Sequence, residues 1–198
     1  DQFEQGKYKV EIIGFAKMIS DIADQATNVV FFFAIAFILT VLAVYWYSRS
    51  WTLTFLPLVC SLTSLVWQFG MLEILGYGLD PLAILVPFLV FAIGVSHGIQ
   101  QVNQITKEVI DGKSAEFAAR ASFSRLIIPG SMALITDLVG FGTLILLPIT
   151  MIKELAITAS IGVAFKIVTN LVMLPLAASY ARYGDSFAVS AQSAISYR

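Results

Sequence analysis

Long stretches without a formal charge constrain this chain more than any other feature. When single polar interruptions are allowed, five stretches reach the roughly 20 residues that an α-helix needs to cross a bilayer. They lie at about residues 28–48, 52–75, 81–104, 126–147 and 154–180. Of the 198 residues, 58% are hydrophobic and 13% are charged, which is not typical of a soluble domain of this size. The sequence predicts an all-α membrane protein, a bundle of five transmembrane helices.

Basic residues are distributed unequally between the two ends of these spans. Lys153 lies near the loops of one side. The other side carries Arg49, Lys107, Lys113, Arg120, Arg125 and Arg182. Because Lys and Arg accumulate in cytoplasmic loops, the second side is expected to be cytoplasmic. The polar segment Lys107–Arg125 is then a cytoplasmic connection, and the chain begins outside.

The two ends of the chain are expected to lie outside the bundle. Residues Tyr8–Phe15 alternate in polarity as a β-strand does, and a lone strand is not stable. We therefore interpret residues 1–27 as the end of an extracytoplasmic domain of a longer protein, leading into the first span. Residues 181–198 carry apolar side chains at helical spacing and predict either an interfacial helix or a disordered cytoplasmic linker.

The third predicted span carries unusual polar residues, in the stretch FAIGVSHGIQQVNQ (residues 91–104). One face of a helix would present His97, Gln100, Gln101 and Gln104, with Gly94 one turn earlier. Polar groups at this depth either bond to neighbouring helices, with Gly94 and Gly98 allowing close approach, or mark a functional path. Both interpretations stay open for the glutamines. His97 lies deeper and is the better functional candidate.

Two charged residues, Asp137 and Lys166, lie near the middle of the last two predicted spans. Each alone is costly in a membrane, so we expect them to come within ion-pair or water-bridged distance in at least one state. Small or polar residues lie about a turn away, Gly140 beside Asp137, and Gly162 and Asn170 beside Lys166. A structural ion pair and a proton-carrying pair are the two alternatives.

Three motifs carry a resemblance to a known family. They are GVSHG in the third span, PG…T…GFG in the fourth and ELAITASIG…LP in the fifth. With the strand-like YKVEIIGFAK, they resemble transmembrane helices 2 to 6 of the first half of a resistance-nodulation-division (RND) transporter. The branch that looks most similar holds the MMPL-type lipid exporters and predicted exporters related to them. The resemblance extends over nearly the whole chain.

This resemblance implies a permease of the bacterial inner membrane that uses the proton-motive force to export or transport a hydrophobic or lipid-like substrate. Its partners would be membrane lipids, the substrate, the remaining half of the transporter and either periplasmic proteins or further copies. Protons would be the coupling ion, with no other cofactor and no metal. Related transporters carry one or two aspartates where this sequence has Ser96 and His97. The candidate proton carriers are therefore His97, or Asp137 with Lys166.

A second class of protein is compatible with these sequence features. Related bundles serve as sterol-sensing-type domains, so a lipid-binding or regulatory membrane module without transport of its own is the alternative. An enzyme is not expected, because the chain has one His and lacks metal-ligand spacing, GxSxG and a phosphate-binding glycine loop. A net charge of −1 gives no indication of nucleic-acid binding.

Overall fold

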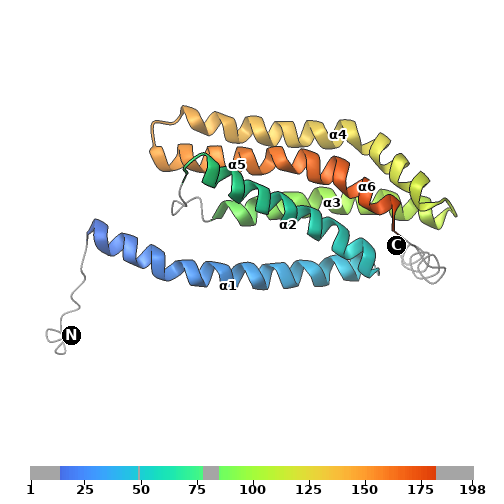
Figure 1. Ribbon diagram of the computed structural model, residues 1–198, viewed down its shortest axis with the longest axis horizontal. Coiled ribbons are helices and arrows are strands. Elements are labelled where there is room, and N and C mark those ends of the chain that lie inside the picture. Colours follow the sequence, from blue (N-terminus) through green and yellow to red (C-terminus); the bar gives the residue numbers. More distant parts are fainter. Residues whose placement is uncertain (1–13, 49, 78–84, 182–198) are drawn as a thin grey trace. The chain divides into compact units, whose positions relative to one another are not determined.

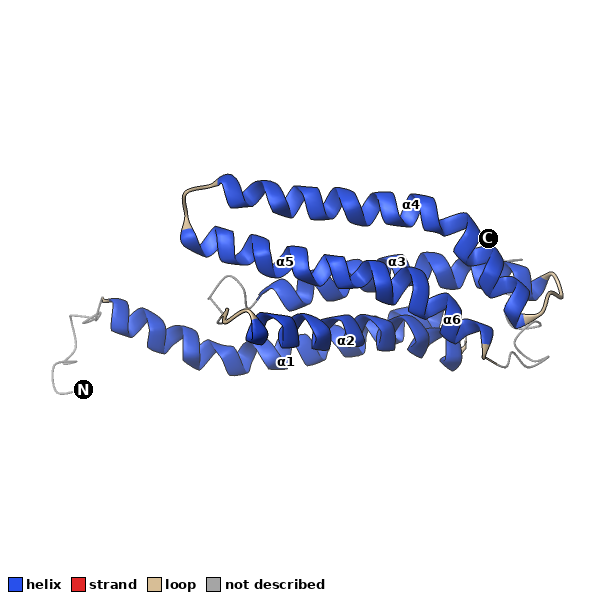
Figure 2. Ribbon diagram, turned by 45° about the horizontal axis from the view of Figure 1, so that its top comes forward, coloured by secondary structure: helices blue, strands red, loops and turns tan. Residues whose placement is uncertain are grey.

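A computed structural model describes residues 14–48, 50–77 and 85–181, and these contain helices and no strand (Figure 2). The chain divides into two units, residues 1–36 and 37–198. Helix α1 (Phe15–Ser48) extends through both. The second unit adds α2 (Trp51–Ile74), α3 (Val86–Ile110), α4 (Ala115–Thr143), the 3-10 turn η2 (Leu144–Leu146), α5 (Thr150–Val168), the π-helix η3 (Thr169–Met173) and α6 (Leu174–Ser179). The predicted all-α membrane bundle is confirmed.

Four segments of the described chain are long and apolar enough to cross a membrane. They are Asn28–Ser48, Trp51–Leu75, Ala115–Leu146 and Thr150–Ser179. The third predicted span, 81–104, begins outside the described residues and continues into α3, whose polar second half sets it apart from those four. The molecule is a multi-pass membrane protein.

The first unit is described from Gly14 onward. The predicted strand Tyr8–Phe15 lies outside the described residues except for its last two positions, where Gly14 forms a bend and Phe15 begins α1. The expected end of the strand is therefore wrong, since the helix starts there. Further along α1, Val30, Phe31 and Phe32 are more than 60% exposed, as lipid-facing side chains of a membrane helix are. Most of the C-terminal segment 181–198 also lies outside the described residues.

The polar connection Lys107–Arg125 between the third and fourth predicted spans is mostly helical. Helix α3 continues to Ile110 and α4 begins at Ala115, so the turn between them is short. Gly112 takes a positive φ of 76° in this turn, and the Ser114 hydroxyl caps α4 by accepting a hydrogen bond from the Phe117 amide at 3.3 Å. The charged and alanine-rich sequence forms helix readily. The two helices therefore continue into this polar segment and do not end where it begins.

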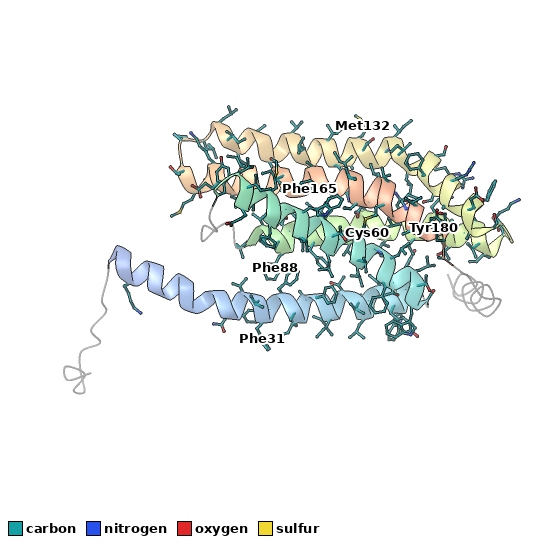
Figure 3. The ribbon with its side chains drawn as sticks, in the orientation of Figure 1. Phe31, Cys60, Phe88, Met132, Phe165 and Tyr180 are labelled. Atoms are coloured by element: carbon teal, nitrogen blue, oxygen red, sulfur yellow. The ribbon has the colours of Figure 1, made fainter. Side chains whose placement is uncertain are left out.

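The second unit is a bundle in which α3 packs against α2, α4 and α5, and α4 runs antiparallel beside α5 (Figure 1). Gly98 lets α3 approach α2, because a Cβ on Gly98 would lie 2.4 Å from the Cβ of Pro57. One buried cluster of the described residues joins Leu53, Cys60, Val102, Ile105, Val109, Ala118, Ala119, Leu174 and Ala178. Large apolar side chains such as Met132, on the outer side of α4 in Figure 3, remain exposed, which suits a surface in contact with lipid.

The last span is one helical rod with an irregular segment inside it. After α5, residues Thr169–Met173 form a π-helix, and Pro175 follows at the start of α6. Proline has no N–H and its ring pushes on the carbonyl four residues earlier, here that of Leu171, so a regular α-helix is disfavoured at this point. A π-helical turn often marks a functional site and leaves backbone carbonyls open to other partners. Asn170 lies in this turn.

Candidate functional site

Lys166 is fully buried in the second unit, with 0% of its surface exposed. Its ammonium Nζ donates a hydrogen bond to the main-chain carbonyl of Ser61 on α2 at 3.1 Å. Gly94 on α3 makes room for it, because a Cβ there would lie 2.2 Å from Nζ. Figure 3 labels the chain neighbours of this pair, Cys60 and Phe165, in the middle part of the bundle. The lysine side chain therefore extends from α5 to a point between α2 and α3.

Asp137 does not pair with Lys166 in this conformation. The two residues lie at similar depth, since their neighbours Leu138 and Ile167 pack in one apolar cluster. Asp137 is half-buried on α4, whereas Lys166 is directed to the Ser61 carbonyl. The described residues give Lys166 no carboxylate partner within 4.0 Å. The expected ion pair is absent because the space beside Gly94 accommodates the ammonium elsewhere.

An amide network next to Lys166 connects α3, α4 and η3. Asn170 Nδ2 donates to the Gly94 carbonyl at 2.6 Å, and Gln101 Nε2 donates to the Asn170 carbonyl at 3.0 Å. Ser122 on α4 donates its hydroxyl to Gln101 Oε1 at 3.0 Å. Gln101 and Asn170 are both buried. For these two residues the packing interpretation accounts for every bond that they form.

The other polar residues of α3 differ from one another in their surroundings. His97 is half-buried and its Nδ1–H donates to the Ile93 carbonyl at 3.0 Å, which leaves Nε2 as an acceptor in the neutral ring. Gln104 Nε2 donates to Glu108 Oε1 at 3.3 Å. Ser96 and Gln100 are exposed. Adjacent positions of a helix differ by about 100° in direction, so Gln100 and Gln101 face different environments.

Two site residues on α2, Ser61 and Gln68, were not among the predicted ones. Gln68 is fully buried and its Nε2 donates to the Thr158 carbonyl at 2.9 Å. The spacing of Ser61, Ser64 and Gln68 at i, i+3 and i+7 in an apolar span is the signal that could have identified them. Gly162 lies against this amide, since a Cβ there would be 2.7 Å from Gln68 Oε1. Gly140, in contrast, has open space around it.

Several buried oxygen atoms near Lys166 accept no hydrogen bond. They are Ser61 Oγ, Gln68 Oε1 and Asn170 Oδ1. Ser61 Oγ and Lys166 Nζ both lie within 3 Å of the same point beside Gly94. Buried polar atoms generally find a partner or an ordered water. The site thus combines a cationic side chain with uncharged oxygen acceptors, an arrangement suited to holding a proton or water. Among the described residues no group of three His, Cys, Asp or Glu could hold a metal.

The fold and the site together define a polytopic membrane bundle with a polar centre. The family model for the sterol-sensing domain of SREBP cleavage-activation matches residues 46–177, which include α2 to α5 and every site residue described above. The chain belongs to this sterol-sensing domain family. Membership indicates a lipid-related function in the membrane.

One relative among the curated proteins is a protein of Methanocaldococcus jannaschii. It is 25% identical over 138 residues, which cover 70% of this chain and 35% of the relative. Its name describes a membrane protein and gives no activity. The chain therefore spans about a third of the length of this relative.

Proposed function

We propose that this bundle is one membrane half of a transporter of the RND superfamily, of the MMPL-type and predicted-exporter branch. It uses the proton-motive force to export or transport a hydrophobic or lipid-like substrate in the bacterial inner membrane. Protons are the coupling ion, no other cofactor is needed, and the protein is not an enzyme. Sterol-sensing domains are found in RND- and MMPL-like membrane proteins, which supports this assignment.

The observation that carries the proposal is the burial of Lys166 with a single carbonyl acceptor. A fully buried, charged amine without a carboxylate partner destabilises the folded protein by several kcal/mol. A purely structural role offers no contact that would offset this cost. A group that gains and loses a proton during a transport cycle explains it better. In one state the amine rests beside Ser61. In another it would pair with a carboxylate, either Asp137 on the neighbouring helix α4 or a group of the remaining half.

A helix movement is needed to exchange these partners. The π-helical turn Thr169–Met173 lies three residues beyond Lys166, and such turns allow one helical register to change into another. His97, whose Nε2 is an acceptor in the neutral ring, would be the group that relays protons between the site and water. In this proposal Gln101 contributes packing and does not carry protons.

The alternative function is a lipid-binding or regulatory module without transport. The match to the sterol-sensing domain favours it, since this is the only activity that the family description itself names. Lys166 would then serve as a hydrogen-bond donor that fixes α5 against α2.

Reconstitution of the full-length protein in proteoliposomes with an imposed pH gradient distinguishes these functions. Transport predicts proton flux that is coupled to movement of a labelled lipid and is abolished in Lys166→Met, whose side chain has a similar volume. Lys153→Met is the matched control, because Lys153 is exposed at the start of α5. Lipid or sterol binding without any gradient-dependent flux in the native protein would establish the alternative.

A further inference from the structure

We propose that the groove between α4 and α6 binds one phospholipid whose headgroup carries a primary amine, of the phosphatidylethanolamine type. The groove has a volume of about 540 Å³. Its walls include Glu116, Arg120 and Phe123 from α4, Val172 from η3, and Leu176 and Tyr180 at the end of the last span. This site is distinct from the Lys166 centre and does not depend on the proposed transport.

The groove has a polar end and an apolar end that follow the bilayer normal. Helix α4 enters the membrane from its Ala115 end and α6 leaves it at Ser179, so Glu116, Arg120 and Tyr180 share one end of the bundle. Phe123, Val172 and Leu176 lie further along both helices, toward the membrane interior. A phospholipid has the same polarity along its length, so its acyl chain would lie on these apolar side chains.

The depth of the polar end matches a headgroup. Helix α4 has 29 residues and is therefore about 43 Å long, more than the hydrocarbon thickness of about 30 Å. Arg120 lies five residues, about 8 Å, after the Ala115 end of α4, within the length by which this helix exceeds the hydrocarbon thickness. This distance places its guanidinium at the headgroup layer of the bilayer.

The order of the two charges matches the order of charges in the headgroup. Arg120 is one helical turn, about 6 Å, closer to the membrane interior than Glu116. In phosphatidylethanolamine the phosphate is attached to the glycerol and the amine lies further out. Arg120 therefore meets the phosphate and Glu116 meets the ammonium group, which can donate hydrogen bonds to a carboxylate. The headgroup of phosphatidylglycerol carries no amine and would place no cation near Glu116.

Apart from the favourable position of Glu116 in the first turn of α4, the two charges contribute little to the fold. Arg120 Nη2 and Glu116 Oε1 lie 2.9 Å apart, and their side chains are 81% and 68% exposed. Such an exposed pair contributes little to stability. The guanidinium has five donors and the pair occupies one nitrogen, so donors remain for a phosphate. Leu176 and Tyr180 beside them are 58% and 82% exposed, which leaves apolar surface available to an acyl chain.

Native mass spectrometry of the full-length protein, titrated with single phospholipids that share the same acyl chains, tests the proposal. We expect phosphatidylethanolamine to bind at least about fivefold more tightly than phosphatidylcholine or phosphatidylglycerol, a difference of about 1 kcal/mol. The exchange variant Glu116→Arg/Arg120→Glu keeps an i, i+4 ion pair and the net charge but reverses the order of charges. It should lose the preference while retaining its thermal unfolding temperature.

A second variant tests the apolar end. Val172→Trp fills the groove and should weaken binding of all three lipids, whereas Met132→Trp, on the exposed outer side of α4, should leave binding unchanged. Tighter binding of phosphatidylglycerol that depends on Arg120 would overturn the proposal in favour of an anionic-lipid site. Equal binding of the three lipids, or a preference that survives the exchange variant, would also overturn it.

Discussion

The ammonium of Lys166 donates a hydrogen bond to the main-chain carbonyl of Ser61, a residue 105 positions earlier in the chain. This contact connects α5 to α2 through the space left by Gly94 on α3. Three helices therefore determine the position of one charge. A change in any of the three helices should alter the position of the Lys166 side chain, and the first prediction rests on this.

Gly94→Ala should destabilise the protein by about 1–3 kcal/mol, because the new methyl group would overlap Lys166 Nζ and its Cε. Chemical unfolding in detergent micelles measures this loss. Shortening the lysine relieves the overlap, so the double variant Gly94→Ala/Lys166→Ala should be more stable than the sum of the single changes predicts. Gly140→Ala is the control and should cost nothing, since its surroundings are open. Additive effects of the two changes would contradict the contact.

Gln101→Leu should destabilise the protein by about 1–2 kcal/mol, while Gln100→Leu should leave stability within about 0.5 kcal/mol. Gln101 is buried and bonds to the Asn170 carbonyl and to Ser122, whereas its neighbour Gln100 is exposed. Thermal unfolding of the two variants makes the comparison. Equal losses would mean that the whole polar face of α3 packs inside the protein.

Asp137→Asn should leave the stability of the protein unchanged, because Asp137 forms no ion pair with Lys166 in this conformation. If the proposed transport is correct, the same variant should reduce coupled proton flux in proteoliposomes. A loss of stability comparable to that of Lys166→Met would instead show that the two residues are paired in the resting state. Unchanged stability together with unchanged flux would remove Asp137 from the proton path.

Asp111→Cys should react with a membrane-impermeant maleimide applied from the cytoplasmic side, and Lys153→Cys from the opposite side. Both positions are exposed, and they lie at opposite ends of the bundle. Cys60 is 2% exposed and should not react in folded protein. Right-side-out and inverted vesicles give the two accessibilities. Labelling of Asp111→Cys from the outside would reverse the assigned orientation.

Local sequence patterns were sufficient for the all-α class of this membrane protein and for four of its spans. The charge-free runs predict helices because the bilayer core requires every backbone group to bond within its own segment. Outside the bilayer, where water can bond to the backbone, a charge-free run is no longer required for a helix, so this pattern does not predict where a helix ends. The polarity of Lys107–Arg125 predicts a connection between two spans, and most of this segment forms helix, since polarity marks the end of a span and not the end of a helix.

The sequence by itself also determined that Lys166, Asp137 and His97 are the unusual groups, because their cost in lipid depends on residue type and depth alone. Only the tertiary structure decided their partners. Whether Lys166 contacts Asp137 or Ser61 depends on how three helices rotate about their axes and how closely they approach at Gly94, and no local pattern specifies these quantities. The separation of Gln100 from Gln101 has the same origin, because a one-residue step on a helix becomes a difference between inside and outside only after packing.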